Sequence, residues 1–310
     1  MKRVIYALAF LLLVACGKEK QDNRLELLDK FMQGQAAYFK FNGNVLVAEK
    51  GNVIYQKSFG VRNFYTQELL NDTTVFELAS VSKQFTAMGI LLLEKQGKLK
   101  LTDSLRYYFP ELPYNNISLH HLLTHTSGLP DYESTMYAKW DHQKIAFNND
   151  MIRFLSQEKP LVHFKPGTKW EYSNTAYAIL ASIIEKVSGT TFKDFLAVNI
   201  FTPLGMMHTR VYNTRRSGER LENYAYGFVW SDSLKQQVLP DSLPDYDYVY
   251  FLDGIQGDGV VNSTTGDLLK WDRGLASKTL IGEATVTKMF FPHALSDSIA
   301  KIYYGYGVFV

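Results

Sequence analysis

An apolar segment at residues 85–93, FTAMGILLL, constrains the fold of this 310-residue chain more than any other feature. Written as a helix, the segment is apolar on nearly every face, and a helix of that kind is buried in a protein core. Gly97 follows it at a position where glycine commonly ends a helix. With 46% hydrophobic and 21% charged residues, the chain has an ordinary globular composition. The sequence therefore predicts a globular domain built around this helix.

Strand-like patterns lie on both sides of a long helical region. Apolar runs at 45–48 and 53–55 flank a polar turn at 49–52, which predicts a β-hairpin. Helical spacing dominates from about residue 119 to 203, and strand-like spacing returns at 224–230. Single helices are expected at 103–108, 176–187, 192–201 and 267–275, the second of them ending at Gly189. This order predicts an α+β fold in which helices are inserted between the halves of one sheet.

The N-terminus has the pattern of a secretory signal. Lys2 and Arg3 precede an apolar run at 4–15 that is too short to span a bilayer. The run ends in Leu-Val-Ala-Cys at 13–16, which resembles a bacterial lipobox, so Cys16 is predicted to be the lipidated first residue of the mature protein. Acyl chains there would hold the protein on a membrane of the bacterial cell envelope. The alternative is an ordinary signal peptide with a chance cysteine.

Cysteine count and charge exclude two further possibilities. Cys16 is the only cysteine, so no disulfide can form within one molecule. The 33 basic and 31 acidic residues give a net charge of +2, which offers no electrostatic basis for binding nucleic acid. Tyrosine and phenylalanine each occur 20 times, mainly as expected core residues, although a tyrosine-lined cleft would suit a polar organic substrate.

Ser80 and Lys83 stand three residues apart just before the apolar segment. Residues three apart on a helix share a face, so the Lys83 amine can approach the Ser80 hydroxyl and activate this weak nucleophile. The backbone N–H groups of a helix start would favour an anionic tetrahedral intermediate. Ser-x-x-Lys also occurs by chance, and Ser80 could instead be a helix N-cap.

Further stretches decide between these interpretations. Ser80 lies in the stretch ELASVSKQFTAMGILLLEKQGKLKLTDSL, and Tyr172-Ser173-Asn174 lies in FKPGTKWEYSNTAYAIL. Two more stretches lie on either side of the Tyr172 stretch: HLLTHTSGLPDY before it and IFTPLGMMHT after it. In this order they resemble signatures of the penicillin-recognising serine hydrolases: class C-type β-lactamases, DD-peptidases and related esterases. The resemblance covers approximately residues 40–310. It implies an antiparallel sheet flanked by helices, with a mainly helical subdomain at about 100–220.

The resemblance assigns roles to four residues. Ser80 would be the nucleophile and Lys83 its activator, while Tyr172 would help Lys83 to move the proton to the leaving group. A phenol can do this only if its pKa falls from about 10 towards neutrality, for which a neighbouring ammonium is the natural cause. Asn174 would hydrogen-bond Lys83 or a substrate amide. The alternatives are that Tyr172 only packs at a helix entrance and that Asn174 caps a helix beginning at Thr175.

Histidines and a glycine-rich loop invite other interpretations. His121 and His125 could share a helical face, and a metallohydrolase is therefore a third hypothesis, but no third ligand stands at zincin spacing. Gly257-Asp258-Gly259 is too short for a phosphate or calcium loop. It resembles the family's glycine-rich loop near the cleft, followed by Asn262 and Ser263. The sequence gives no reason to expect a metal or another cofactor.

The family's third motif, Lys-Thr-Gly or His-x-Gly on a strand facing the nucleophile, does not occur in this sequence. Lys278-Thr279-Leu280 and His293-Ala294-Leu295 lack the glycine, and 304–310 resembles the strand that precedes the motif in relatives. In relatives that strand supplies one of two oxyanion-hole donors, and losing one costs about 10²–10³ in rate. Its absence would also leave strand edges unpaired beside the 44–61 hairpin. The chain is therefore interpreted as incomplete at its C-terminus.

Together these observations predict three parts: a lipoprotein signal at 1–16, a tether and first helix at 17–40, and a β-lactamase-related serine hydrolase domain at 41–310. The predicted function is that of an envelope-anchored serine hydrolase forming an acyl-enzyme on Ser80. Its substrate would be an ester, a D-amino-acid peptide or a β-lactam. The alternative is a catalytically inactive binding or sensing module of the same fold, which the missing third motif favours.

Overall fold

The computed structural model describes residues 23–38, 40–215 and 218–310. The chain divides into two compact units, residues 1–41 and 42–310. The first unit contains α1 (Arg24–Tyr38), none of whose side chains is buried. The predicted signal and the lipidation site Cys16 lie outside the described residues. Within the described ranges, no helix is both long and apolar enough to cross a membrane.

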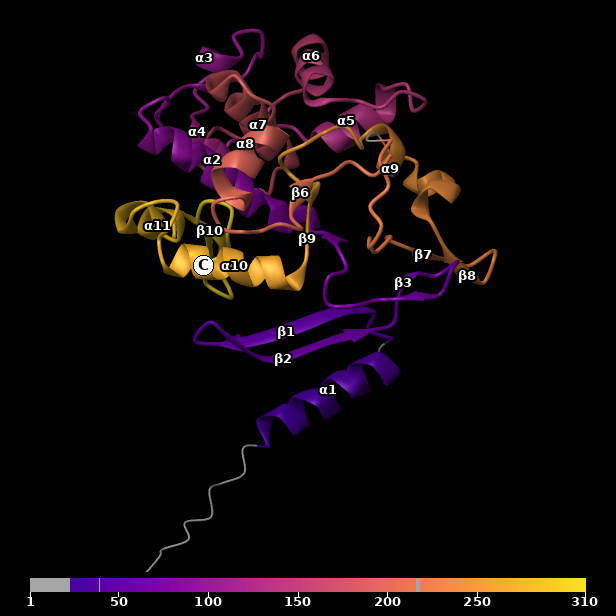
Figure 1. The fold of residues 1–310 in the computed structure, drawn as a ribbon. Coiled ribbons are helices and arrows are strands. Elements are labelled where there is room, and N and C mark those ends of the chain that lie inside the picture. The colour runs from indigo at the N-terminus through magenta and orange to yellow at the C-terminus, as the bar shows by residue number, and fades with distance from the viewer. Residues whose placement is uncertain (1–22, 39, 216–217) are drawn as a thin grey trace, which may run out of the picture. The chain divides into compact units, whose positions relative to one another are not determined.

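The second unit begins with the predicted hairpin (Figure 1). Strands β1 (Gly43–Glu49) and β2 (Asn52–Phe59) pair antiparallel from Gly43↔Phe59 to Glu49↔Asn52, with an irregularity after Val47. Gly51 occupies the turn with a φ of 78°, a conformation that glycine adopts without strain. The hairpin expected from the sequence is therefore confirmed.

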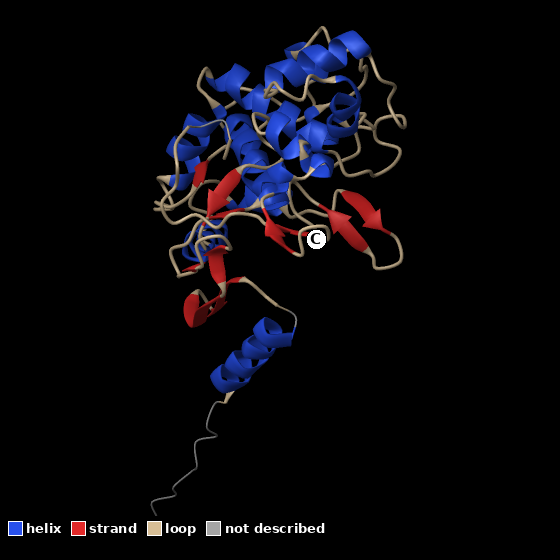
Figure 2. Ribbon diagram, turned by 90° about the vertical axis from the view of Figure 1, so that its right-hand side faces the viewer, coloured by secondary structure: helices blue, strands red, loops and turns tan. Residues whose placement is uncertain are grey.

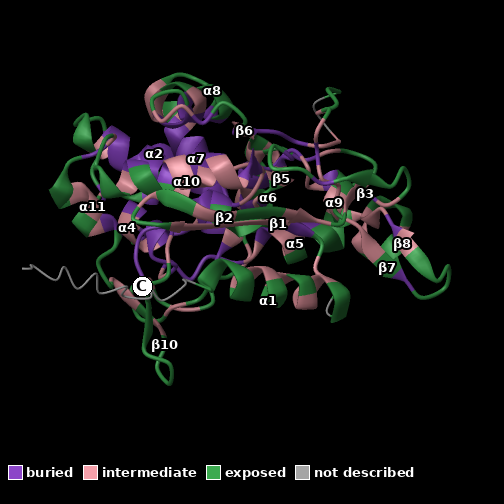
Figure 3. Ribbon diagram, turned by 60° about the horizontal axis from the view of Figure 1, so that its bottom comes forward, coloured by how far each residue is buried: buried purple, intermediate pink, exposed green. Residues whose placement is uncertain are grey.

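Two buried helices, α2 (Lys83–Lys95) and α7 (Asn174–Ser188), pack against each other at the centre of this unit (Figure 3). At Gly89 an added Cβ would lie 2.7 Å from Ile184 Cδ1, so a larger residue would require the Ile184 side chain to shift. Helix α2 is followed by its C-cap residue Gln96 and then by Gly97, and helix α7 is followed by its C-cap residue Gly189. Both glycines have positive φ, a conformation that commonly ends a helix. The predicted central helix and its end are confirmed.

Shorter helices surround this pair and are grouped above the short strands in Figure 2. Several of them begin at side-chain N-caps: Ser104, Ser118, Asp131, Thr191 and Thr264 each accept a backbone N–H of the first turn, as Ser173 does for α7. The remaining helical elements are η1 (Ala79–Ser82), α3 (Leu105–Tyr108), α4 (Leu119–Leu123), α5 (Tyr132–Lys139), α6 (Asn148–Glu158), α8 (Phe192–Leu196), η2 (Ala197–Phe201), η3 (Pro240–Ser242), η4 (Pro244–Tyr246), α9 (Tyr248–Phe251), α10 (Thr265–Ala276) and α11 (Glu283–Met289).

Strands from distant parts of the sequence meet in a small sheet. β5 (Phe76–Glu77), β9 (Val261–Ser263) and β6 (Arg210–Val211) form an antiparallel sheet in the order β5-β9-β6. The helical region lies between β5 and β6 of this sheet, but the predicted hairpin β1–β2 forms a separate two-stranded sheet and not one half of it. The other strand pairs are β3 (Val61–Asn63) with β4 (Glu68–Leu69), β7 (Val229–Ser231) with β8 (Gln236–Val238), and β10 (Ala294–Asp297) with β11 (Ile302–Tyr304). The fold is α+β.

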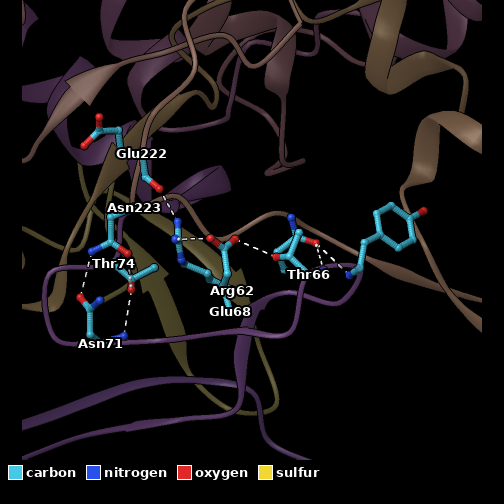
Figure 4. Close-up of polar contacts among 9 residues, drawn as sticks. Arg62, Thr66, Glu68, Asn71, Thr74, Glu222 and Asn223 are labelled. Carbon is cyan, nitrogen blue, oxygen red and sulfur yellow. Dashed lines mark hydrogen bonds and ion pairs between the residues drawn. The ribbon is translucent and has the colours of Figure 1, made fainter.

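Side chains around Arg62 join residues 62–74 to residues 222–223 (Figure 4). Arg62 donates to the Glu222 carbonyl and, at 2.9 Å, to Glu68 Oε1. Thr74 Oγ1 donates to Asn223 Oδ1 at 3.0 Å, and Val75 N–H donates to the Asn223 carbonyl at 2.8 Å. These bonds fix the start of the loop that carries Tyr224.

Two expected strands differ from the structure. At 224–230 only β7 is regular, because Tyr224 forms a single bridge with Val75 while the Tyr226 N–H donates to the Arg62 carbonyl. These residues pair with two separate segments, so no continuous ladder forms. At the C-terminus β11 ends at Tyr304, and residues 305–309 turn back so that Phe309 forms a bridge with Tyr304. The expected single strand over 304–310 was therefore wrong.

Candidate active site

Ser80 lies in η1, the turn that leads into α2, and its side chain is solvent-exposed. Ala79 before it has a φ of 46°, a strained conformation for alanine that the surroundings must hold. Strand β9 fixes this turn by two hydrogen bonds: Leu78 N–H donates to the Val261 carbonyl at 2.9 Å, and Val261 N–H donates to Ser82 Oγ at 3.0 Å. Ser82, not Ser80, occupies the N-cap position of α2. The N-cap interpretation of Ser80 was therefore wrong.

Lys83 is buried, with 1% of its surface exposed, and its ammonium has three acceptors. Nζ donates to Ser80 Oγ at 3.2 Å, to Asn174 Oδ1 at 2.8 Å and to the Asp258 carbonyl at 2.7 Å. These acceptors use all three protons of the ammonium and fix its position beside the Ser80 hydroxyl. The predicted proximity of Ser80 and Lys83 is present in the structure.

Asn174 is the first residue of α7 and bridges two charged side chains. Its Oδ1 accepts from Lys83, and its Nδ2 donates to Glu133 Oε1 at 2.7 Å. Ser173 caps the helix instead, accepting the Ala176 N–H at 3.1 Å. The alternative that Asn174 is the cap was therefore wrong, and its carboxamide is free to orient Lys83.

Tyr172 lies beside the same ammonium, with Lys83 Nζ 4.8 Å from the centre of its ring. His125 positions it: the two rings lie 4.4 Å apart, the His125 carbonyl accepts the Glu171 N–H at 2.9 Å, and Nδ1 accepts the Ser173 N–H at 3.0 Å. Burial, and secondly the Lys83 charge, hold the pKa of His125 well below its usual value, so the ring is neutral and able to accept. Tyr172 as a proton carrier stays a prediction.

The Gly257-Asp258-Gly259 loop forms another wall of the site. Its Gly257 carbonyl accepts from Thr86 Oγ1 at 2.6 Å, and the Asp258 carboxylate accepts from the Tyr132 hydroxyl at 2.8 Å. Burial raises the pKa of Asp258, and the nearby Lys83 charge and the Tyr132 hydrogen bond oppose that rise. The loop therefore presents a backbone carbonyl and, behind it, a buried carboxylate to Lys83.

Sequence reasoning did not identify Glu133 or His125 as parts of this site, and it placed the Gly257-Asp258-Gly259 loop near the cleft without giving Asp258 a role. Glu133 follows directly after the HLLTHTSGLPDY stretch, and that proximity was the available signal. His125 lay within the same stretch but was considered only as a metal ligand. Asp258 acts through its main-chain carbonyl, which residue type does not predict.

The histidines considered for a metal have other contacts. His121 Nδ1 accepts the Ser118 N–H at 3.2 Å as part of the N-cap of α4, and His125 holds the Tyr172 segment. Among the described residues, no group of three or more histidine, cysteine, aspartate or glutamate side chains is arranged to hold a metal ion.

The two tripeptides closest to the family's third motif, Lys278-Thr279-Leu280 and His293-Ala294-Leu295, make contacts away from Ser80. Lys278 pairs with Glu283 at 2.8 Å. The His293 ring stacks on Tyr306 at 4.1 Å, and its Nε2 lies 2.8 Å from the Lys288 carbonyl. Among the described residues, neither tripeptide forms a hydrogen bond with Ser80.

An exposed serine, a buried lysine in hydrogen-bond contact with it and an asparagine on a second helix define the class of site found in serine-lysine hydrolases. The chain matches the Beta-lactamase family over residues 28–310 and belongs to that family. It is 44% identical to penicillin-binding protein 4* of Bacillus subtilis (strain 168) over 287 residues. That match covers 93% of this chain and 63% of the relative, so the chain spans less than two thirds of the relative's length.

Solved structures share the fold. A penicillin-binding protein from Bacillus halodurans superposes with a TM-score of 0.78 at 27% identity, covering 91% of this chain and 82% of that one. A D-amino acid amidase from Ochrobactrum anthropi SV3, in complex with L-phenylalanine amide, superposes with a TM-score of 0.66 at 27% identity. This superposition covers 86% of this chain and 73% of the amidase chain. The predicted family and fold are confirmed.

Proposed function

We propose that this protein is a serine hydrolase that forms an acyl-enzyme on Ser80. The observation that carries the proposal is the contact of the buried Lys83 ammonium with the exposed Ser80 hydroxyl, 3.2 Å apart. In the reaction, the Lys83 ammonium first gives up one proton to solvent, and the neutral amine then takes the Ser80 proton while Oγ attacks the substrate carbonyl. The leaving group then receives a proton, with Tyr172 placed beside the same amine, and water later releases the acyl group.

The Ser80 backbone contributes to charge stabilisation in this scheme. Ser80 is the second residue of η1, and the first N–H groups of a helix have no acceptor within it. Its N–H is therefore one donor for the oxyanion of the tetrahedral intermediate. Substrates are proposed to be amides, esters or β-lactams, because each presents a carbonyl that an activated serine can acylate. The relatives named as penicillin-binding proteins and as a D-amino acid amidase support this range.

Replacing Ser80 with alanine is expected to abolish covalent labelling by a fluorophosphonate and by a fluorescent penicillin, because the only attacking oxygen in the scheme is removed. Labelling is measured by gel fluorescence and the modified residue by peptide mass spectrometry. Ser298→Ala, which removes an exposed hydroxyl in the turn between β10 and β11, is the control and should be labelled as wild type. Labelling that persists in Ser80→Ala at the wild-type level contradicts the assignment.

The competing proposal is a non-catalytic binding or sensing module. The same labelling experiment distinguishes the two. A folded wild-type protein that neither probe labels supports the binding module, whereas labelling that depends on Ser80 supports the hydrolase.

We also propose that the protein is a lipoprotein of the bacterial cell envelope, anchored through Cys16. The basic start, the apolar run at 4–15 and the residues Leu-Val-Ala-Cys support this. Cys16→Ala is expected to move most of the protein from the detergent phase to the aqueous phase in a phase-partition assay, because acyl chains supply the membrane affinity. Ser80→Ala should partition as wild type. An unchanged partition of Cys16→Ala contradicts the anchor.

A further inference from the structure

A cavity of about 600 Å³ lies apart from the candidate catalytic residues, none of which lines it. Its walls come from the starts of α6 and α8, the last turn of α7, and β6 with the residues after it. Helices α6 and α8 both pack against α7, and α8 packs against β6 (Figure 1). Asn174 is the first residue of α7, whereas Glu185 lines the cavity eleven residues later, about 16 Å along the helix axis. The cavity is therefore separate from the Ser80 site, and its volume is that of a small-molecule site.

Amide side chains form one wall of this cavity, and hydrogen bonds already hold them in place. The Asn148 carboxamide accepts the Gln256 N–H at 2.8 Å and donates to the Gln256 carbonyl at 2.9 Å. The Gln256 side chain in turn donates to Oδ1 of the buried Asn213 at 2.9 Å, and its own Oε1 remains an acceptor. Groups that are fixed before a ligand arrives lose little conformational freedom when it binds. This wall therefore offers a preorganised set of polar atoms.

The charged groups of the cavity restrict the kind of ligand. Its carboxylates are Glu185, Asp194 and Glu219, whereas Lys193 is the one cation among the described lining residues. The excess of carboxylates repels an anionic ligand. In the part of the chain that the structure describes, no three such side chains are grouped to hold a metal ion. The polar walls suit a ligand rich in hydroxyl groups, because a hydroxyl can donate to a carboxylate and also accept from an amide.

Aromatic rings add an apolar surface beside these polar groups. Phe147, which precedes α6, is 37% exposed, and Tyr212 after β6 is almost completely buried. An exposed aromatic ring provides a flat apolar surface. The ring of a sugar has apolar C–H faces bordered by hydroxyl groups, so it can pack one face on Phe147 while its hydroxyl groups meet the amides and carboxylates. The cavity thus presents both kinds of surface that a sugar requires.

We propose that this cavity binds a neutral oligosaccharide, with one sugar ring packed on Phe147. The site goes beyond the proposed hydrolase function, because the sugar forms no covalent bond and contacts none of the candidate catalytic residues. The protein then holds a saccharide at one site while Ser80 reacts with an acyl group at another.

The test measures binding of tri-N-acetylchitotriose to the full chain by isothermal titration calorimetry. Sugar concentrations up to about 5 mM detect dissociation constants of about 1 mM or below. Trigalacturonic acid, which also has three sugar rings but carries three carboxylates, is the comparison ligand. It is expected to bind at least about tenfold more weakly than the neutral sugar, because the carboxylates of the cavity repel it.

Two variants locate the bound sugar. Phe147→Ala is expected to weaken binding about 5- to 10-fold, because the sugar ring loses its aromatic surface. Asn149→Ala changes an exposed residue of α6 that also lines the cavity, and should weaken binding about 3- to 10-fold, as for one neutral hydrogen bond. Phe291→Ala removes a ring that is 56% exposed and lies outside the cavity lining, so it is the matched control and should bind as wild type. Thermal unfolding checks that each variant is folded.

Four outcomes overturn the proposal. Folded wild type may show no binding of the neutral sugar, or it may bind trigalacturonic acid equally well. Wild-type affinity in both Phe147→Ala and Asn149→Ala would place the sugar outside the cavity. Loss of sugar binding in Ser80→Ala, which should bind as wild type, would place the sugar at the catalytic residues. Failure of Ser80 labelling, in contrast, refutes the proposed hydrolase and leaves the expected sugar binding unchanged.

Discussion

Replacing Lys83 with methionine is expected to lower the rate of Ser80 acylation by about 10³-fold or more. General-base catalysis alone contributes roughly 10²–10⁴ in rate, and Lys83, the proposed base, lies at hydrogen-bond distance from Ser80 Oγ. Methionine has a similar length and fills the buried space without an amine. The measurement is the second-order rate constant for labelling by a fluorophosphonate.

The control for this variant must separate chemistry from folding. Lys83→Met leaves Asn174 Oδ1 and the Asp258 carbonyl without their donor, at a cost of about 1–3 kcal/mol for each buried acceptor. Rates are therefore compared at a temperature where thermal unfolding shows both proteins to be folded. Lys95→Met removes an exposed lysine at the far end of α2 and should retain the wild-type rate. A folded Lys83→Met protein within about tenfold of wild type would exclude Lys83 as the base.

The parts of the fold that could be predicted from sequence are those whose pattern is local. The apolar segment at 85–93 predicts a buried helix, and the polar turn between two apolar runs predicts a hairpin such as β1–β2. Ser80 and Lys83 were predicted together for the same reason, since helical spacing alone brings them into contact. Tyr172 and Asn174 came from resemblance, because no local rule joins them to residue 83.

The rest of the site depends on tertiary contacts that sequence spacing does not encode. Glu133 reaches the site because α5 packs beside α7, which brings its side chain to Asn174. Asp258 contributes its carbonyl because Thr86 and Tyr132 hold the glycine-rich loop against α2 and α5. Residues 224–230 failed as a strand since their partners, Val75 and Arg62, lie in different segments. In each of these places the chain's long-range packing decides the geometry.

The glycine-rich loop gives the second large effect that we expect, this time on stability. Gly257 has a φ of 108°, and an added Cβ would lie 2.5 Å from both the Tyr177 carbonyl oxygen and the Ala181 Cβ of α7. Gly257→Ala combines an unfavourable backbone conformation with overpacking, which together cost about 2–5 kcal/mol in the free energy of unfolding. The loop carries the Asp258 carbonyl, so the variant should also acylate Ser80 more slowly.

Gly259, two residues along the same loop, is the matched control. Its φ is outside the left-handed region, and an added Cβ there would meet nothing within 4 Å. Gly259→Ala should therefore change the free energy of unfolding by no more than about 1 kcal/mol. Urea unfolding of both variants, followed by tryptophan fluorescence, measures the difference. If the two substitutions destabilise the protein equally, the close packing of Gly257 on α7 does not determine the loop, and the Asp258 carbonyl must be held at Lys83 by the Thr86 and Tyr132 hydrogen bonds alone.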